Sequence, residues 1–252
     1  MSQKFVQSDW EEYARCYDSL LNLTPYQHML ERVARNVRTT QHYTILDASC
    51  GTGNFEKVFC ESSDQNFQIT GIDRAGAMLE RARKKCASWP HCFFAETDLN
   101  QNLDFEDESF GQVVSINTLY AVKNPETTLR EFFRVLVPGG VLFLVTPKYG
   151  YENGLILKEH CRSSKPDSYW VDVHQSPERE EKLIREALDD EVAITDMLTI
   201  ARFNRSIASE DTFHFYYQEE LKTVLEKVGL AVKEVSYVYA HQDIFAIAQK
   251  ET

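Results

Sequence analysis

Short apolar runs alternate with amphipathic segments along most of the chain. Runs rich in β-branched and aromatic residues predict strands at 43–48, 67–73, 92–95, 111–117 and 141–146. Between these runs, apolar residues recur at helical spacing. Asn124-Pro125, for example, predicts a helix start, and Leu129, Phe132 and Leu136 share one face of the helix that follows. This alternation is typical of an α/β protein whose parallel strands are connected by crossover helices.

The apolar pattern also predicts the centre and the end of the sheet. The runs at 111–117 and 141–146 are almost continuously apolar, as expected for central strands with helices on both faces. Residues 217–228 predict a helix, and 231–239 and 244–248 predict two strands joined by the polar turn Ala240-His241-Gln242-Asp243. Because this turn is short, the last two strands should be antiparallel. The sequence therefore predicts a doubly wound sheet of seven strands with the last strand antiparallel.

Two regions fall outside this alternation. Residues 1–40 predict two amphipathic helices, the second beginning at Thr24-Pro25. Residues 148–212 predict a polar, mostly helical insertion after the fifth strand, with a helix start at Ser176-Pro177. Insertions of this length in compact domains are usually lids or binding elements. We expect one domain over residues 1–252, with 1–40 as an N-terminal helical cap and 148–212 as a helical lid.

Composition and charge narrow the possible partners. The 252 residues include 27 Lys+Arg and 39 Asp+Glu, giving a net charge of −12, which argues against nucleic acid as a partner. The densest basic run, at 81–85, lies on a predicted helix and is interpreted as a solvated face. No apolar run reaches the roughly 20 residues that span a bilayer, which predicts no membrane partner. A small-molecule substrate is the remaining expectation, and the pattern predicts no particular oligomeric state.

The cysteines and the first residues predict a cytoplasmic protein. The six cysteines form no C-x-x-C pair and have no zinc-type spacing with histidine, so we expect free thiols and no metal site. The opening residues MSQKFVQSDW lack the basic and apolar regions of a secretory signal.

The sharpest local feature is a glycine turn that follows the first predicted strand. Gly51-Thr52-Gly53 lets the backbone approach a ligand closely and opens a helix whose first N–H groups are unpaired. A tight strand-to-helix turn without a ligand is the alternative interpretation. Asp73 favours a ligand, because it ends the next strand about twenty residues later, where a carboxylate can accept from ribose hydroxyls. The residues after Gly53 lack the third glycine of dinucleotide-binding turns, which favours a ligand with ribose but no pyrophosphate.

Further polar residues follow the third and fourth strands. Asp98, after the third strand, could accept a hydrogen bond from an exocyclic amine such as that of adenine. A loop cap or Asx-turn is the alternative role for Asp98. Asn117 and Tyr120 lie at and just after the end of the fourth strand, on the edge of the sheet where the other candidates gather.

Together these motifs resemble the class I S-adenosylmethionine (SAM)-dependent methyltransferases. The resemblance covers residues 10–147 and 213–249 and rests on several matching stretches in order: Ile45-Leu46-Asp47, Cys50-Gly51-Thr52-Gly53, Gly71-Ile72-Asp73, Asp98-Leu99, Arg134-Val135-Leu136 and Pro138-Gly139-Gly140. It implies the Rossmann-like form of the predicted sheet. Ser49 stands where the family commonly has its first glycine, and Gly111 where it often has Asp.

The resemblance implies a role for each candidate. Asp47 and the loop from Ala48 to Gly53 would face the methionine part of SAM, and Asp73 its ribose. The remaining contacts would be with adenine, the sulfonium region and the N-terminal segment that folds over the cofactor. The implied cofactor-binding residues are Tyr17, Asp47, Ala48, Ser49, Gly51, Gly53, Asp73, Arg74, Met78, Asp98, Leu99, Asn117 and Tyr120. For Tyr17, a buried core residue is the alternative.

Methyl transfer requires positioning and exclusion of water more than a particular catalytic group. A base is needed only for a hydroxyl or protonated amine acceptor, and Tyr120, His174 and His214 are the candidates, with a structural role as the alternative for both histidines. The favoured function is methyl transfer to a small molecule. One alternative is a lyase or cyclase in which SAM attacks itself and releases methylthioadenosine. A non-catalytic SAM-binding protein is the other.

Overall fold

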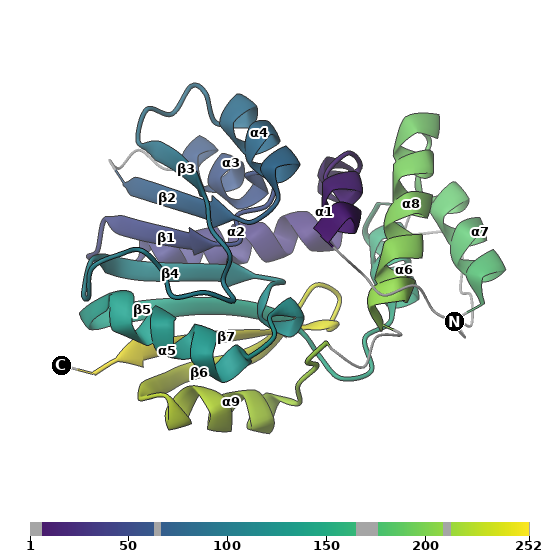
Figure 1. Ribbon diagram of the computed structural model, residues 1–252. Helices are drawn as coiled ribbons and strands as arrows, with labels where there is room; N and C mark the ends of the chain where they lie inside the picture. Colours follow the sequence, from purple (N-terminus) through teal and green to yellow (C-terminus); the bar gives the residue numbers. More distant parts are fainter. Residues whose placement is uncertain (1–6, 63–66, 165–175, 209–212, 252) are drawn as a thin grey trace.

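A seven-stranded mixed sheet forms the centre of the computed structural model, which describes residues 7–62, 67–164, 176–208 and 213–251 (Figure 1). The strand order is β3-β2-β1-β4-β5-β7-β6. All neighbours are parallel except β7, which is antiparallel to both β5 and β6. The predicted fold class, including the antiparallel last strand, is confirmed. The strands are β1 (Thr44–Ala48), β2 (Gln68–Asp73), β3 (Cys92–Glu96), β4 (Phe110–Ile116), β5 (Leu136–Pro147), β6 (Leu230–Val238) and β7 (Asp243–Lys250).

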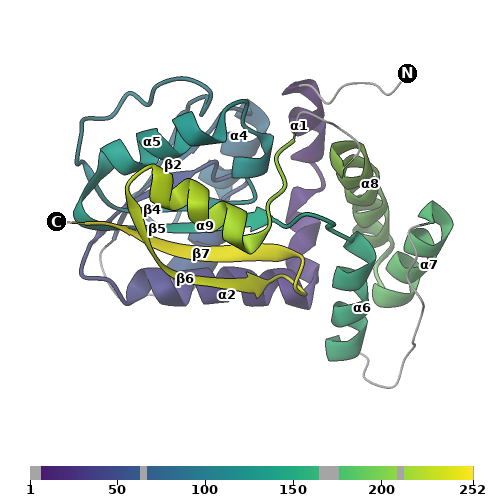
Figure 2. The same cartoon turned by 90° about the horizontal axis from the view of Figure 1, so that it is seen from below.

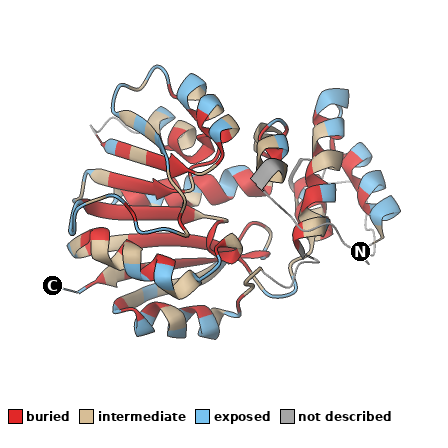
Figure 3. Ribbon diagram, viewed as in Figure 1, coloured by how far each residue is buried: buried red, intermediate tan, exposed pale blue. Residues whose placement is uncertain are grey.

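Helices cover both faces of the sheet, so its central strands are buried (Figure 3). Successive residues point to opposite faces. Ile45 packs with α2 (Thr24–Arg38) and α3 (Asn54–Glu61), whereas Leu46 packs with α5 (Pro125–Val135) and α9 (Gln218–Lys227). Val114 and Val113 of β4 divide in the same way. Helix α4 (Gly76–Lys85) lies beside β2 and β3. The prediction that the apolar runs at 111–117 and 141–146 form central strands buried on both faces is therefore confirmed.

The remaining elements gather beyond the carboxyl ends of the parallel strands (Figures 1 and 2). They comprise α1 (Gln7–Tyr13), the 3-10 helices η1 (Tyr17–Asn22) and η2 (Leu119–Ala121), and the insertion helices α6 (Asn153–Ser164), α7 (Pro177–Ala187) and α8 (Glu191–Ala208). The insertion after β5 is helical as expected, and α8 packs on α1 and η1. The N-terminal region contains η1 in addition to the two expected helices.

Two boundaries differ from the sequence prediction for physical reasons. Strand β5 begins at Leu136 rather than 141, because Leu136 already pairs with Phe110 across an irregularity in the β4–β5 ladder. The sequence predicts a polar turn at residues 240–243, but not all of these residues are exposed. Asp243 is the first residue of β7, and both Asp243 and Gln242 are buried.

Candidate functional site

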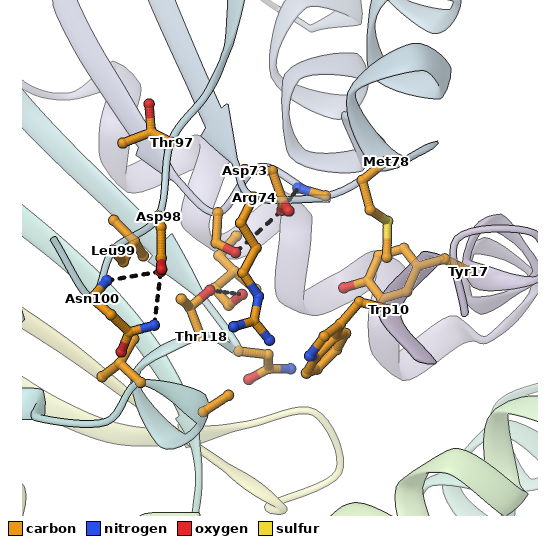
Figure 4. Close-up of a pocket in the computed structure, with 16 residues that line it drawn as sticks. Trp10, Tyr17, Asp73, Arg74, Met78, Thr97, Asp98, Leu99, Asn100 and Thr118 are labelled. Atoms are coloured by element: carbon orange, nitrogen blue, oxygen red, sulfur yellow. Dashed lines mark hydrogen bonds between the residues drawn. The ribbon is translucent and has the colours of Figure 1, made fainter. Parts of the chain in front are cut away.

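A pocket opens at the carboxyl ends of β1, β2 and β4, where the sequence places most of its candidates (Figure 4). It contains about 660 Å³ of empty space, including space open to solvent. The candidates that border it are Tyr17, Ser49, Gly51, Asp73, Arg74, Met78, Asp98, Leu99 and Asn117. Trp10, Thr97, Asn100 and Thr118 also border it and were missed by the sequence reasoning. We call this space the strand-end pocket.

Asp73 fastens the glycine turn to the end of β2. Its Oδ2 accepts from the Gly51 N–H at 3.0 Å and from the Ser49 hydroxyl at 3.2 Å, and its Oδ1 accepts from the Ala75 N–H at 2.9 Å. Burial raises the pKa of Asp73, and these three hydrogen bonds oppose that rise. Asp73 therefore presents a hydrogen-bonded carboxyl group to the strand-end pocket.

The departure at Ser49 has a local explanation. Ser49 adopts a φ of 77°, in the left-handed region that favours glycine, and Gly51 and Gly53 follow with φ values of 55° and 79°. The hydroxyl bond to Asp73 helps to hold Ser49 in this conformation. A side chain at Gly53 would meet Ala82 of α4 at 3.1 Å, so this glycine permits close packing of the turn on α4.

Asp98 forms the local turn that the sequence analysis gave as its alternative role. Its Oδ1 accepts from the backbone N–H of Asn100 at 3.0 Å and from the Asn100 side chain at 2.7 Å, which is a local turn. The same residue borders the strand-end pocket, as does Leu99 beside it. Figure 4 shows Arg74 between Asp98 and Trp10, and the guanidinium of Arg74 lies 6.0 Å from the Trp10 ring centre.

Asp47, Ala48 and Gly53 do not border the strand-end pocket. Asp47 and Ala48 are buried at the end of β1, and Gly53 is the residue that precedes α3. Asp47 has a second buried carboxyl group, that of Glu56, as its neighbour. Burial raises the pKa of Glu56 to about 7, and burial together with the charge of Glu56 raises the pKa of Asp47. These residues therefore support the glycine turn without bordering the strand-end pocket.

The N-terminal segment is fixed over the strand-end pocket by polar contacts. Lys85 donates to Asp18 Oδ1 at 2.6 Å, and the Thr52 hydroxyl donates to the same oxygen at 2.6 Å. The Glu11 carboxylate accepts from the Gly76 and Ala77 N–H groups, at 3.1 and 2.9 Å. The interpretation of residues 81–85 as a solvated face was therefore wrong for Lys85, whose side chain is only 13% exposed because it reaches Asp18.

A second cavity adjoins the strand-end pocket and contains about 630 Å³ of empty space, including space open to solvent. Trp10, Tyr17 and Asn117 border both spaces. The other lining residues come from the N-terminal region, η2, the end of β5, the insertion, the segment before α9 and the β6–β7 turn. They are mostly aromatic: Tyr13, Leu20, Tyr26, Tyr120, Pro147, Tyr151, Asn204, Ile207, Phe215 and Tyr239. Among the described residues, no charged side chain borders this space, which we call the aromatic cavity.

The two catalytic candidates that the structure describes, Tyr120 and His214, do not border the same space. Tyr120 borders the aromatic cavity rather than the strand-end pocket, and its ring stacks on Phe215 with centres 6.0 Å apart. His214 borders neither space, although its backbone N–H donates to the Tyr120 carbonyl at 2.8 Å. His174 lies outside the described residues. In the described ranges, no group of three or more His, Cys, Asp or Glu residues could hold a metal ion, and no helix is long and apolar enough to cross a membrane.

A family model described as a methyltransferase domain matches residues 46–144, which contain the glycine turn, Asp73 and Asp98. Over these residues the chain is similar to methyltransferase domains. It is 31% identical over 136 residues to the demethylmenaquinone methyltransferase of Staphylococcus aureus, an alignment that covers 53% of this chain and 56% of that protein. The chain therefore spans about half the length of the curated relatives it matches.

Solved structures agree with the methyltransferase fold over nearly the whole chain. A SAM-dependent methyltransferase from Aquifex aeolicus has a TM-score of 0.59 and 16% identity, covering 98% of this chain and 100% of that one. The N-methyltransferase NodS from Bradyrhizobium japonicum, solved with S-adenosylhomocysteine, has a TM-score of 0.59 and 15% identity, covering 92% and 91%. At these identities the similarity concerns the fold alone.

Proposed function

We propose that this chain transfers a methyl group from SAM, held in the strand-end pocket, to a small molecule held in the aromatic cavity. The observation that carries the proposal is that the two spaces lie next to each other and share lining residues. Trp10, Tyr17 and Asn117 border both, so a ligand in one space lies next to a ligand in the other. Methyl transfer needs donor and acceptor side by side in a site from which water is excluded.

The residues of the strand-end pocket fit the parts of SAM. Asp73 keeps acceptor capacity on Oδ1 for ribose hydroxyls, and Asp98 has its second oxygen for the adenine amine. Arg74, Met78 and Leu99 supply the surfaces around the adenine, and Ser49 and Gly51 lie where the methionine end would be. When bound, SAM supplies an electrophilic methyl carbon: an acceptor lone pair bonds to it while the carbon–sulfur bond breaks and leaves its electron pair on sulfur.

Residues behind the pocket have supporting roles in this proposal. Asp47, Ala48 and Gly53 shape the glycine turn without touching the cofactor. Burial raises the pKa of the Tyr120 hydroxyl, so at neutral pH this group is protonated and serves as a hydrogen-bond donor rather than a base. His214 positions Tyr120 through its backbone, and His174 remains a candidate base by its place in the sequence.

The aromatic cavity favours methyl transfer over the lyase or cyclase alternative. A reaction of SAM with itself needs no space beyond the cofactor, whereas this structure has a second, mostly aromatic cavity next to the strand-end pocket. An intact Asp73 and Asp98 at the pocket argue against a protein that has lost its cofactor.

We further propose that the chain acts as one cytoplasmic domain, with residues 1–40 as cap and 148–212 as lid. Its net charge of −12 supports a substrate other than nucleic acid.

The placement of SAM is tested by Asp73→Ala. Loss of the carboxylate should weaken SAM binding by about 10- to 100-fold, as expected when a charged hydrogen-bond acceptor is removed. Isothermal titration calorimetry measures this, and the melting temperature shows that the variant is folded. Asp104→Ala, which removes an exposed carboxylate away from the pocket, should bind SAM as the wild-type protein does. Equal affinity in all three proteins would place the ribose elsewhere.

A further inference from the structure

Two buried oxygen atoms have no hydrogen-bond partner: one belongs to Asn117, which borders the aromatic cavity, and the other to Asp243, which pairs with the lining residue Pro147. Asp243, at the start of β7, is 0% exposed and accepts from Asn117 Nδ2 through its Oδ2 at 3.0 Å. Its Oδ1 has no partner, and neither has the Oδ1 of Asn117. Both atoms can only accept hydrogen bonds while the carboxyl group is ionised. Since leaving such groups buried and unpaired is costly, a ligand with N–H or O–H donors would stabilise them.

The surroundings of these oxygens favour a donor with a positive charge. Asn117 borders the aromatic cavity, and the charge of Asp243 acts on the hydroxyls of Tyr120, Tyr151 and Tyr239, which border it too. Burial raises the pKa of Asp243 to about 7, because no cation in the described part of the chain compensates its charge. The aromatic rings around the cavity also attract cations through their faces.

We propose that the aromatic cavity binds a small primary or secondary amine in its protonated form, with its N–H groups donated to the unpartnered oxygens of Asn117 and Asp243. This inference rests on the proposed function and specifies its acceptor. The ammonium first gives one proton to the Asp243 carboxylate. Its nitrogen lone pair then forms the bond to the methyl carbon as the carbon–sulfur bond breaks, so that the products are a methylated amine and S-adenosylhomocysteine.

Other classes of acceptor fit the cavity less well. A carboxylate or phosphate would be buried without a Lys or Arg in the described walls to compensate its charge. An alcohol or phenol supplies only one donor for two orphaned oxygens and gains little from the aromatic faces. A quaternary ammonium has neither a donor nor a lone pair for the new bond. Only an amine provides donors, a positive charge and a nucleophilic atom together.

The test compares three probes that share a phenylethyl group and differ in the polar group attached to it: phenethylamine, 2-phenylethanol and 3-phenylpropionate. Calorimetry measures the binding of each to the protein alone and to the protein saturated with S-adenosylhomocysteine. The amine should bind at least about tenfold more tightly than the alcohol, as expected for charge-assisted hydrogen bonds. Mass spectrometry should detect methylated phenethylamine when SAM is added.

Asp243→Asn removes the charge but keeps an oxygen for Asn117, and should reduce the preference for amine over alcohol to about twofold or less. Its affinity for S-adenosylhomocysteine should not change. Asp104→Asn makes the same chemical change on an exposed loop and should retain the preference. Tyr151→Phe should keep amine binding and Tyr151→Leu should weaken it, because only the former retains the ring face.

The inference is overturned if the amine does not bind, if the alcohol or the carboxylate binds as tightly, or if Asp243→Asn leaves the preference intact. Binding of S-adenosylhomocysteine separates this failure from failure of the proposed function. A protein that binds the nucleoside but not the amine retains the function and loses the inference. A protein that binds no SAM or S-adenosylhomocysteine loses the proposed function, while amine binding to the protein alone still decides the cavity's chemistry.

Discussion

Single buried carboxyl groups set how this protein responds to pH. Glu56 lies next to Asp47 beneath the glycine turn, and burial raises its pKa from 4.5 to about 7. Between these two values the folded protein holds a proton that the unfolded chain releases. The free energy of unfolding therefore falls as pH rises through this window, and Asp243, with a pKa also raised to about 7, contributes in the same direction.

Glu56→Gln should flatten part of this pH dependence. A neutral amide carries no charge to bury, so the variant should match the wild-type melting temperature near pH 5 and exceed it near pH 8. Thermal unfolding followed by circular dichroism across this range measures the difference. Glu96→Gln, at an exposed position on the edge strand β3, serves as the matched control. A Glu56→Gln variant whose profile is parallel to that of the wild type would show that Glu56 is ionised at neutral pH in the folded protein.

The sequence predicted site residues where strand ends alone decide their position. Asp73 and Asp98 follow apolar strands, and parallel strands bring their carboxyl ends to one edge of the sheet. Trp10 and Asp243 were missed because tertiary packing places them. Trp10 reaches the site through the docking of α1, and Asp243 resembles one more polar residue of a turn until pairing of β7 with β5 buries it.

At the scale of elements, the N-terminal segment is held to the Rossmann-like sheet by side chains that the methyltransferase motifs do not include. Glu11 binds the first N–H groups of α4, and Asp18 binds Lys85 at the other end of that helix. These two contacts hold α1 and η1 in place, and with them Trp10 and Tyr17, which border both spaces. The cap thus depends on α4 for its position.

Lys85→Met should loosen this contact. The substitution leaves Asp18 and Asn54 without their lysine partner, so the segment that carries Tyr17 should be less ordered and SAM should bind about tenfold more weakly. Calorimetry with SAM measures the change. Lys84→Met, at the neighbouring exposed position on α4, is the control and should bind normally. Equal affinities for both variants would mean that the Lys85–Asp18 contact does not position the cap.

Element boundaries show which part of the fold local patterns determine. The helix starts at Asn124 and Ser176 were predictable because each residue accepts a hydrogen bond from the first turn of its helix. The early start of β5 was not, because Pro138-Gly139-Gly140 is a turn signal that strand pairing overrides. The insertion was predicted as helical, but its packing on α1, η1 and α2 depends on contacts between distant segments.

At the scale of the whole molecule, the strand-end pocket and the aromatic cavity lie next to each other and share Trp10, Tyr17 and Asn117 as lining residues. The carboxyl ends of the strands and the N-terminal segment line the strand-end pocket. The N-terminal segment, the insertion, the β6–β7 turn and the residues Tyr120, Pro147 and Phe215 line the aromatic cavity. The insertion contributes Asn204, which accepts from the Tyr13 hydroxyl at 3.1 Å, and Ser19 of η1 donates to Asp196 at 2.6 Å. The N-terminal segment and the insertion are therefore joined to each other, which suits the proposed enclosure of a small acceptor away from water.

The most direct test of the account is mass spectrometry of the purified protein incubated with SAM, with and without a panel of small amines, alcohols and carboxylic acids. Methyl transfer predicts S-adenosylhomocysteine and one methylated acceptor in equal amounts, with methylthioadenosine no higher than in a sample without protein. Protein-dependent methylthioadenosine in the absence of any acceptor would contradict the account, because SAM itself would then be the substrate.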